Sequence, residues 1–399
     1  MTRKLSVRLG ILAGLCLWAG VFCLGAQKAA SIRPKPSSHR AATAAEPSGE
    51  RVIRYVREKF GVPGSTSMSL DPFHKSPDPE FLDSTIAVDD GKNTKTSKRS
   101  SDISVTKDGH YLVMSFLPVG GAGASSIFPL GKDANQEIAR AVHLAFKVPD
   151  SVTVEAGPFR STPFPNFQIT TITANSAGKK QTLDAYVTRD HRYLILGNVY
   201  DMASDPRSKA LRTLVLQNQP ETGPRNAPVT MVEFADLECP TCAMTHAFLE
   251  NTLLPKYQGK IRLVFKEFPL TMIHEWAMTA AIANQCAYRI NPQDYLPYRT
   301  LIFQHQSDFE GIKANASAVR DLLVDYGKQA GIDGLQLSGC IDSKASLPRI
   351  EENVKEAHAL DVNSTPTFFI NGNILVGGGP PENFYQVIDD ALQASRKKK

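Results

Sequence analysis

The stretch "EFADLECPTCAMTHAFLENTLLPKY", Glu233–Tyr257, decides the fold of the C-terminal half of the chain. It passes from an apolar, strand-like segment into a helical one, and Cys239 and Cys242 lie at the change. Pro240 suits the first position of a helix, because an N–H at that position has no intrahelical partner. The spacing therefore predicts that Cys239 stands at a helix N-terminus, with Cys242 one helical turn further in.

This position favours thiolate chemistry, since unpaired backbone N–H groups at a helix N-terminus point at the sulfur. A free cysteine has a pKa of about 8.5, whereas cysteines at such sites have values of roughly 3.5 to 7.5, so we expect Cys239 to be the attacking sulfur. Cys242 should have the higher pKa and should close or resolve a disulfide. The alternatives are a zinc site, for which the sequence offers no second pair of soft ligands at short spacing, and two structural thiols. We predict no metal and no dissociable cofactor.

The order of elements around this motif is the thioredoxin arrangement of strand, helix, strand, then two strands and a helix. A helical stretch of about 274–359 separates the two halves of that arrangement. The sequence thus predicts that residues 229–396 form an α/β domain of the thioredoxin type, which contains the helical insertion. The expected strands and final helix are "VTMVEFA", "IRLVFKEFP", "TPTFFING", "NILVGG" and "PENFYQVIDDALQAS".

Together these features resemble the DsbA-like branch of the thioredoxin superfamily. The resemblance rests on "CPTC" after an acid-bearing strand, on "VNSTPTFFING", Val362–Gly372, and on the helical insertion. It implies that Pro366 has a cis peptide bond and packs beside Cys239. The backbone of Thr365 would then offer hydrogen bonds to a bound substrate strand.

Two further positions bear on the chemistry. Glu233 stands where members of this family often hold a partly buried acid, which would relay the proton of Cys242; the alternative is a solvated glutamate at a sheet edge. Lys266 is a candidate charge partner of Glu233, but the strand register is left open. Thr241 departs from the strongly oxidising members of the family, which carry a histidine between the cysteines. A milder redox potential is therefore expected.

Cys286 and Cys340 both fall in the helical insertion. In an oxidising compartment, an even pair within one subdomain most simply forms a structural disulfide. The alternative is two separate buried thiols, because cysteine often packs as a small hydrophobe.

The N-terminus predicts export. Basic residues precede an uncharged apolar run, Leu9–Ala26, so residues 1–26 read as a signal peptide or membrane anchor, and residues 27–47 as a low-complexity linker. Cys16 and Cys23 lie inside this run and have no assigned chemistry. Export places the protein in the periplasm or another extracytoplasmic, oxidising compartment. The formal charge of +5 is spread along the chain, and we predict no nucleic-acid partner.

The intervening half of the chain contains a repeat. Arg51–Phe81 aligns without gaps on Glu137–Phe167, which indicates a tandem duplication of an α+β unit, residues 48–132 and 133–217. A proline-rich linker is expected at 218–228. Leu183–Pro206 weakly resembles the N-terminal module of DsbC-like disulfide isomerases. The two copies are therefore either an intramolecular pseudo-dimer or an unrelated spacer or binding domain.

These features predict an exported thiol–disulfide oxidoreductase that acts on thiol- or disulfide-containing client proteins and exchanges electrons with a membrane redox partner. The direction is left open: an oxidase keeps the CPTC pair as a disulfide, whereas an isomerase or reductase keeps Cys239 reduced. A hypothesis of another class is a chaperone that holds unfolded clients through the repeats.

Overall fold

The computed structural model describes residues 47–89, 91, 98–114, 127–176 and 179–396. The expected signal peptide or anchor, with Cys16 and Cys23, lies outside these residues. Within the described part, no helix combines the length and the apolar composition needed to span a bilayer. The described residues form two compact units, one of residues 47–56 with Gly64–Ser204 and one of Arg57–Pro63 with residues 205–396.

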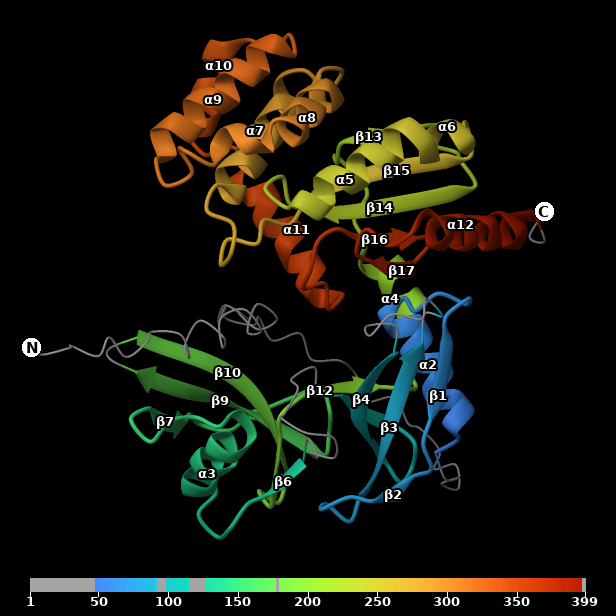
Figure 1. Ribbon diagram of the computed structural model, residues 1–399, viewed down its shortest axis with the longest axis vertical. Coiled ribbons are helices and arrows are strands. Elements are labelled where there is room, and N and C mark those ends of the chain that lie inside the picture. Colours follow the sequence, from blue (N-terminus) through green and yellow to red (C-terminus); the bar gives the residue numbers. More distant parts are fainter. Residues whose placement is uncertain (1–46, 90, 92–97, 115–126, 177–178, 397–399) are drawn as a thin grey trace, which may run out of the picture. The chain divides into compact units, whose positions relative to one another are not determined.

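The two sequence repeats fold into matching sets of elements, each with one helix and a series of short strands (Figure 1). The helices are amphipathic, and their apolar positions are buried, as at Val52 and Val56 in the first copy and Ile138 and Val142 in the second. The first set is α2 (Gly49–Phe60), β1 (Ser67–Leu70), β2 (His74–Lys75), β3 (Phe81–Asp89), β4 (Lys98–Thr106), β5 (Tyr111–Met114) and β6 (Ile127–Pro129). The second set is α3 (Ala134–Phe146), β7 (Thr153–Ala156), β8 (Arg160–Ser161), β9 (Phe167–Ser176), β10 (Lys179–Thr188), β11 (Tyr193–Ile195) and β12 (Asn198–Asp201).

The last strand of each repeat completes the sheet of the other. The first sheet has the order β1-β3-β4-β5-β12 with β2 beside β3, and the second has the order β6-β11-β10-β9-β7 with β8 beside β9. Val199 of β12 lies opposite Val113 of β5, and Ile127 of β6 lies opposite Ile195 of β11. Each copy thus supplies its sixth strand to its partner, which is a strand exchange within one chain.

A shared apolar core joins the two copies. Phe81 and Phe167, which occupy the same position of the repeat, approach each other with ring centroids 6.1 Å apart. The rest of this core comes from both sheets. The two repeats are therefore one packed pair. The buried cluster contains Phe81, Tyr111, Val113, Ile127, Phe167, Tyr193, Ile195 and Val199.

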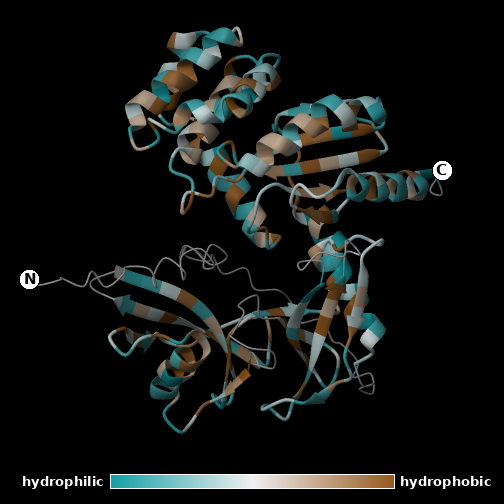
Figure 2. Cartoon of the chain, in the orientation of Figure 1, coloured by the Kyte–Doolittle hydropathy of each residue, from teal (hydrophilic) through white to brown (hydrophobic). Residues whose placement is uncertain are grey.

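The C-terminal unit is built on a mixed sheet of order β13-β15-β14-β16-β17. Strand β14, Val229–Ala235, pairs in parallel with β15, Ile261–Glu267, and antiparallel with β16, Thr367–Ile370. Both parallel strands are buried along nearly their whole length, and apolar colour dominates them in Figure 2. Burial on both faces explains why "VTMVEFA" reads as a nearly continuous apolar run.

Helices cover this sheet and form the insertion. One apolar cluster packs α12 against the sheet, another packs α4 and α11 against the opposite face, and a third lies among the insertion helices. The remaining elements are α4 (Pro206–Thr213), β13 (Glu221–Thr222), α5 (Pro240–Phe248), a π-helical turn (Leu249–Leu253), α6 (Leu254–Lys256), α7 (Ala277–Ile290), α8 (Tyr295–Gln304), a 3-10 turn (Gln306–Phe309), α9 (Ala316–Gln329), α10 (Gly334–Asp342), α11 (Leu347–Ala359), β17 (Asn373–Val376) and α12 (Pro381–Arg396).

The segment expected as a linker, 218–228, differs from that expectation, because it is part of the C-terminal unit. Strand β13 pairs with β15, and the buried Gln219 donates its amide to Asn353 at 2.9 Å. Glu221 is also fixed by Arg262, with an Nη2–Oε2 distance of 2.5 Å. Proline-rich composition indicates an irregular backbone, but these contacts anchor that backbone to the sheet. The division between the units nearest to this segment lies instead between Ser204 and Asp205.

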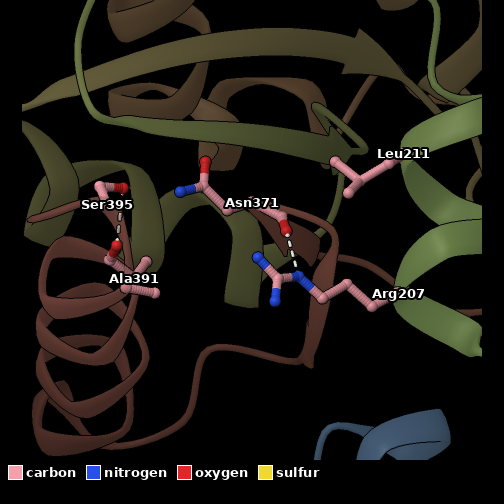
Figure 3. A pocket seen from close by; sticks show the side chains of 6 residues that line it. Arg207, Leu211, Asn371, Ala391 and Ser395 are labelled. Atoms are coloured by element: carbon pink, nitrogen blue, oxygen red, sulfur yellow. Dashed lines mark hydrogen bonds between the residues drawn. The ribbon is translucent and has the colours of Figure 1, made fainter. Parts of the chain in front are cut away.

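A small pocket lies between α4, the turn after β16 and α12 (Figure 3). Arg207 donates from Nε to the carbonyl oxygen of Asn371 at 3.0 Å, which attaches α4 to that turn. Ser395 donates to Ala391 on the opposite wall. The guanidinium and the hydroxyl are thus already used in contacts within the unit.

Candidate active site

Cys239 occupies the N-cap of α5, and Pro240 is the first residue of that helix. The cysteine backbone is extended, with φ −72° and ψ 119°, so its side chain lies over the first helical turn. Cys239 and Cys242 are the free cysteines of the described residues, and both are buried. Figure 1 shows α5 directly after the carboxyl end of β14, which places the pair at one end of the sheet.

The surroundings of Cys239 stabilise its thiolate. A hydrogen bond from the Cys242 thiol is the largest influence and lowers the pKa of Cys239 to about 5, helped by the backbone N–H groups of Cys242 and Thr241, although burial opposes the shift. Cys242 is affected in the opposite way, because burial raises its pKa well above the usual value. The two sulfurs are therefore distinct at neutral pH, one a thiolate and the other a protonated donor.

The Thr365–Pro366 peptide bond is cis, and it faces Cys239. The Sγ of Cys239 lies 3.6 Å from the carbonyl oxygen of Thr365. The carbonyl oxygen of Pro366 accepts the N–H of Gly377 at 2.8 Å, which ties the loop after β17 to the same strand. The adjacent Gly378 lies so close to α5 that an added Cβ would come within 2.3 Å of the Thr245 hydroxyl. These contacts join the cis-proline segment, the loop after β17 and helix α5.

A buried ion cluster lies within the same unit. Glu233 is completely buried, and its Oε2 accepts a hydrogen bond from Nη2 of Arg299 at 3.0 Å. Nη1 of Arg299 lies 3.8 Å from Oε1 of Glu267. Burial raises the pKa of both carboxyls, against the opposing charge of Arg299. One guanidinium thus serves two carboxyls, and Glu233 is not a solvated residue at a sheet edge.

Lys266 is not the charge partner of Glu233. Glu233 lies opposite Phe265 in the parallel ladder, whereas Lys266 lies opposite Phe234 and so faces the other side of the sheet. There its ammonium lies 2.8 Å from the carboxylate of Glu356 on α11. The observed strand register therefore places Glu233 and Lys266 on opposite faces of the sheet.

Arg299 was missed by the sequence reasoning. It lies in the insertion, 66 positions after Glu233, and in "YLPYRTLIF" it is the charge within an apolar run. A single charge in an apolar run indicates a buried arginine, and a buried arginine needs a charge partner, because arginine is almost never fully buried unless it is paired.

Cys286 of α7 and Cys340 of α10 form a disulfide bond, with Cα atoms 5.9 Å apart. The bond joins two helices of the insertion. Among the described residues, no three His, Cys, Asp or Glu side chains gather in a way that could hold a metal ion.

Comparison with known proteins finds matches to part of the chain. Residues 216–390 match the family model described as Thioredoxin. The Na(+)/H(+) antiporter NhaA 3 of Salinispora tropica is 31% identical over 150 residues, which are 38% of this chain and 21% of that protein. The Na(+)/H(+) antiporter NhaA 1 of Salinispora arenicola is 31% identical over 174 residues, 44% of this chain and 25% of that protein. The chain thus spans about a quarter of the length of the curated relatives it matches.

Among solved structures, the comparison finds similarity to BdbD of Bacillus subtilis in its oxidised form, 23% identical, with a TM-score of 0.39, covering 45% of this chain and 95% of that one. The thiol-disulfide exchange protein alpha-DsbA2 of Wolbachia pipientis is 20% identical, with a TM-score of 0.40, covering 46% of this chain and 95% of that one.

The family match and the observed element order show that residues 216–390 have a thioredoxin fold with a helical insertion.

Proposed function

We propose that the protein is an exported thiol–disulfide oxidoreductase that exchanges disulfides with client proteins through Cys239 and Cys242. The observation that carries the proposal is the contrast between the two thiols, since the pKa of Cys239 is lowered to about 5 while burial raises that of Cys242. Disulfide exchange needs one thiolate to attack and a second thiol to resolve the intermediate. The contact of the Cys239 sulfur with the carbonyl of Thr365 supports a role of Thr365 and Pro366 in positioning the client strand.

In the reducing direction, the Cys239 thiolate attacks one sulfur of a client disulfide. An S–S bond forms between enzyme and client as the client disulfide breaks and releases a thiolate. Cys242 then loses its proton and attacks the Cys239 sulfur, which closes the CPTC disulfide and releases the second client thiolate. The client gains two electrons and the CPTC pair loses two. The oxidising direction is the reverse of these steps.

Glu233 is proposed to take the proton of Cys242. Its Oε1 is buried and accepts no hydrogen bond from any described residue, although Oε2 is held by Arg299. Burial raises the pKa of this carboxyl, which makes it a better proton acceptor than an exposed glutamate.

Export and a membrane redox partner are part of the same proposal. The apolar run Leu9–Ala26 would direct the chain across the membrane or hold it there. The disulfide between Cys286 and Cys340 supports an oxidising compartment, because such bonds rarely persist in reducing cytosol. A periplasmic location would bring the CPTC pair to thiol- or disulfide-containing clients, with electrons passed to or from a membrane protein.

The test is reduction of insulin by dithiothreitol with the purified protein as catalyst. We expect Cys239→Ala to abolish catalysis, and Cys242→Ala to accumulate a mixed disulfide with a client peptide. A Cys286→Ala/Cys340→Ala variant is the control, since it removes two other cysteines of the same unit and keeps the CPTC pair. Undiminished catalysis by Cys239→Ala would refute the proposal.

Isomerisation is the second candidate, and the packed pair of repeats favours it. Leu183–Pro206 weakly resembles the N-terminal module of DsbC-like isomerases, and here the two repeats pack as a pair within one chain, with Phe81 against Phe167. The reduction potential of the CPTC pair distinguishes the directions. A value near about −120 mV is that of a strong oxidant, whereas one near about −270 mV is that of a reductant such as thioredoxin. Refolding of scrambled ribonuclease then separates an isomerase from a simple reductase.

A further inference from the structure

The turn that leads into the CPTC helix carries two carboxylates, Asp236 and Glu238, and both hold the loop after β15. Asp236 is buried, and its Oδ2 accepts the N–H of Leu270 at 2.7 Å. Glu238 accepts the N–H groups of Glu275 and Trp276 at 3.1 and 2.6 Å. The backbone N–H of Cys239 is in turn donated to the carbonyl oxygen of Asp236 at 3.2 Å. The loop at 270–276 is therefore fixed against the turn that leads into Cys239.

His274 of this loop is bound directly to Asp236, with Nδ1 2.7 Å from Oδ2, and its side chain is 15% exposed. Burial alone would lower its pKa, but the hydrogen bond and charge of Asp236, with the charges of Glu238 and Cys239, raise that pKa above the usual value. Glu275, the next residue, lies 3.9 Å from the ammonium of Lys313. The groups facing His274 are thus mostly negative.

The negative charges of this turn should destabilise a thiolate at Cys239, and a protonated His274 offsets them. Pro240 and Thr241, which follow Cys239, carry no charge, whereas Asp236 and Glu238 precede it within three positions. Nearby negative charges disfavour a thiolate, whereas a nearby imidazolium favours it. A protonated His274 neutralises Asp236 at the point where the turn meets α5.

We propose that His274, held by Asp236, is a positioning residue that supplies the positive charge stabilising the Cys239 thiolate. The inference rests on the proposed function and adds a residue that is distant from the CPTC motif in sequence. His274 acts through its charge on the sulfur and takes no part in bond making.

The first experiment is alkylation of Cys239 by iodoacetamide as a function of pH, followed by mass spectrometry of its peptide in the reduced full-length protein. His274→Gln should raise the midpoint by about one pH unit. With a starting pKa of about 5, the rate at pH 5 should fall about fivefold. Adding Asp236→Asn to His274→Gln removes the unneutralised carboxylate, so the midpoint should return toward that of the unsubstituted protein.

A structural role for His274 would give a different pattern, because the double variant would then be at least as perturbed as His274→Gln alone. His110→Gln is the matched control: it removes a histidine from another His–Asp pair, whose Nε2–Oδ1 distance to Asp201 is 3.3 Å, in the N-terminal unit. The control midpoint should not move. An unchanged midpoint in His274→Gln overturns the inference.

A second measurement needs no substitution. If the thiolate and the imidazolium stabilise each other, the effect is reciprocal, and the NMR titration of His274 should have a higher midpoint in the reduced protein than in the CPTC-oxidised protein. Equal midpoints overturn the inference even where a variant fails to fold. Neither experiment uses a client, so failure here is distinct from loss of insulin reduction by the unsubstituted protein, which would refute the proposed function instead.

Discussion

Nη2 of Arg299 lies 3.0 Å from Oε2 of Glu233, and neither side chain is exposed to solvent. The pair joins the central strand β14 to helix α8 of the insertion. It therefore connects the CPTC-bearing fold to the segment inserted between its two halves.

Removing the charge of Arg299 should strongly destabilise the C-terminal unit. Arg299→Met leaves Glu233 and Glu267 buried without a cation, and loss of one partner from a buried ion pair typically costs about 3–5 kcal/mol. Guanidinium denaturation followed by Trp276 fluorescence measures the change. Arg262→Met is the control, because its pair with Glu221 is partly exposed and should contribute about 1 kcal/mol or less. Equal losses in the two variants would contradict this interpretation.

The stability of the reduced protein should depend on pH through Cys239. Its folded pKa of about 5 is depressed below that of a free cysteine, so the stabilisation exists at higher pH and is lost as pH falls through the folded pKa. Between pH 7 and pH 5, the reduced form should lose about 2 kcal/mol of unfolding free energy that the oxidised form keeps. Denaturation of both forms at several pH values checks this. Parallel pH profiles for the two forms would show that the thiolate is not stabilised by folding.

The disulfide of the insertion should stabilise the fold without supporting the chemistry. Opening the loop between Cys286 and Cys340, which lie 54 positions apart, should cost about 4 kcal/mol by the chain-entropy relation. We expect Cys286→Ser/Cys340→Ser to melt at lower temperature while keeping the alkylation midpoint of Cys239. A shifted midpoint would mean that the disulfide also positions the reactive helix.

The two repeats should lose structure together. Phe81→Ala removes a ring from the core shared by both copies, and a truncation of this size typically costs about 3–5 kcal/mol. Hydrogen exchange of the full-length protein should then accelerate in β9 and β10 of the second repeat as well as in β3 and β4 of the first. Acceleration confined to the first repeat would indicate that the copies are independently stable.

The local parts of the site were predictable from sequence, and the long-range parts were not. The position of Cys239 follows from Pro240 and the spacing to Cys242, which act within one helical turn. The partner of Glu233 depends on the strand register and on the rotation of a helix far along the chain, and neither is encoded near Glu233. Lys266 was a reasonable candidate in sequence, but alternation along β15 turns it to the opposite face.

The same limit applies to the repeats. The duplication is visible in the sequence because matched residues recur at a fixed offset. The exchange of β6 and β12 is not visible, since strands this short carry no local signal for the sheet that they join. His274 was likewise not singled out, because its relation to Asp236 arises only when the loop after β15 closes onto the turn before α5.

The exchanged strands constrain how this chain can evolve. Because β6 lies in the second sheet and β12 in the first, neither repeat has a complete sheet without the other. Deletion of one repeat would therefore also remove a strand from the sheet of the repeat that remains. The outward surfaces of the copies are free of that constraint. Each repeat has its own stretch of the sequence, so the outward surfaces of the two repeats can acquire different side chains. A symmetric pair can then become a single chain with two different surfaces.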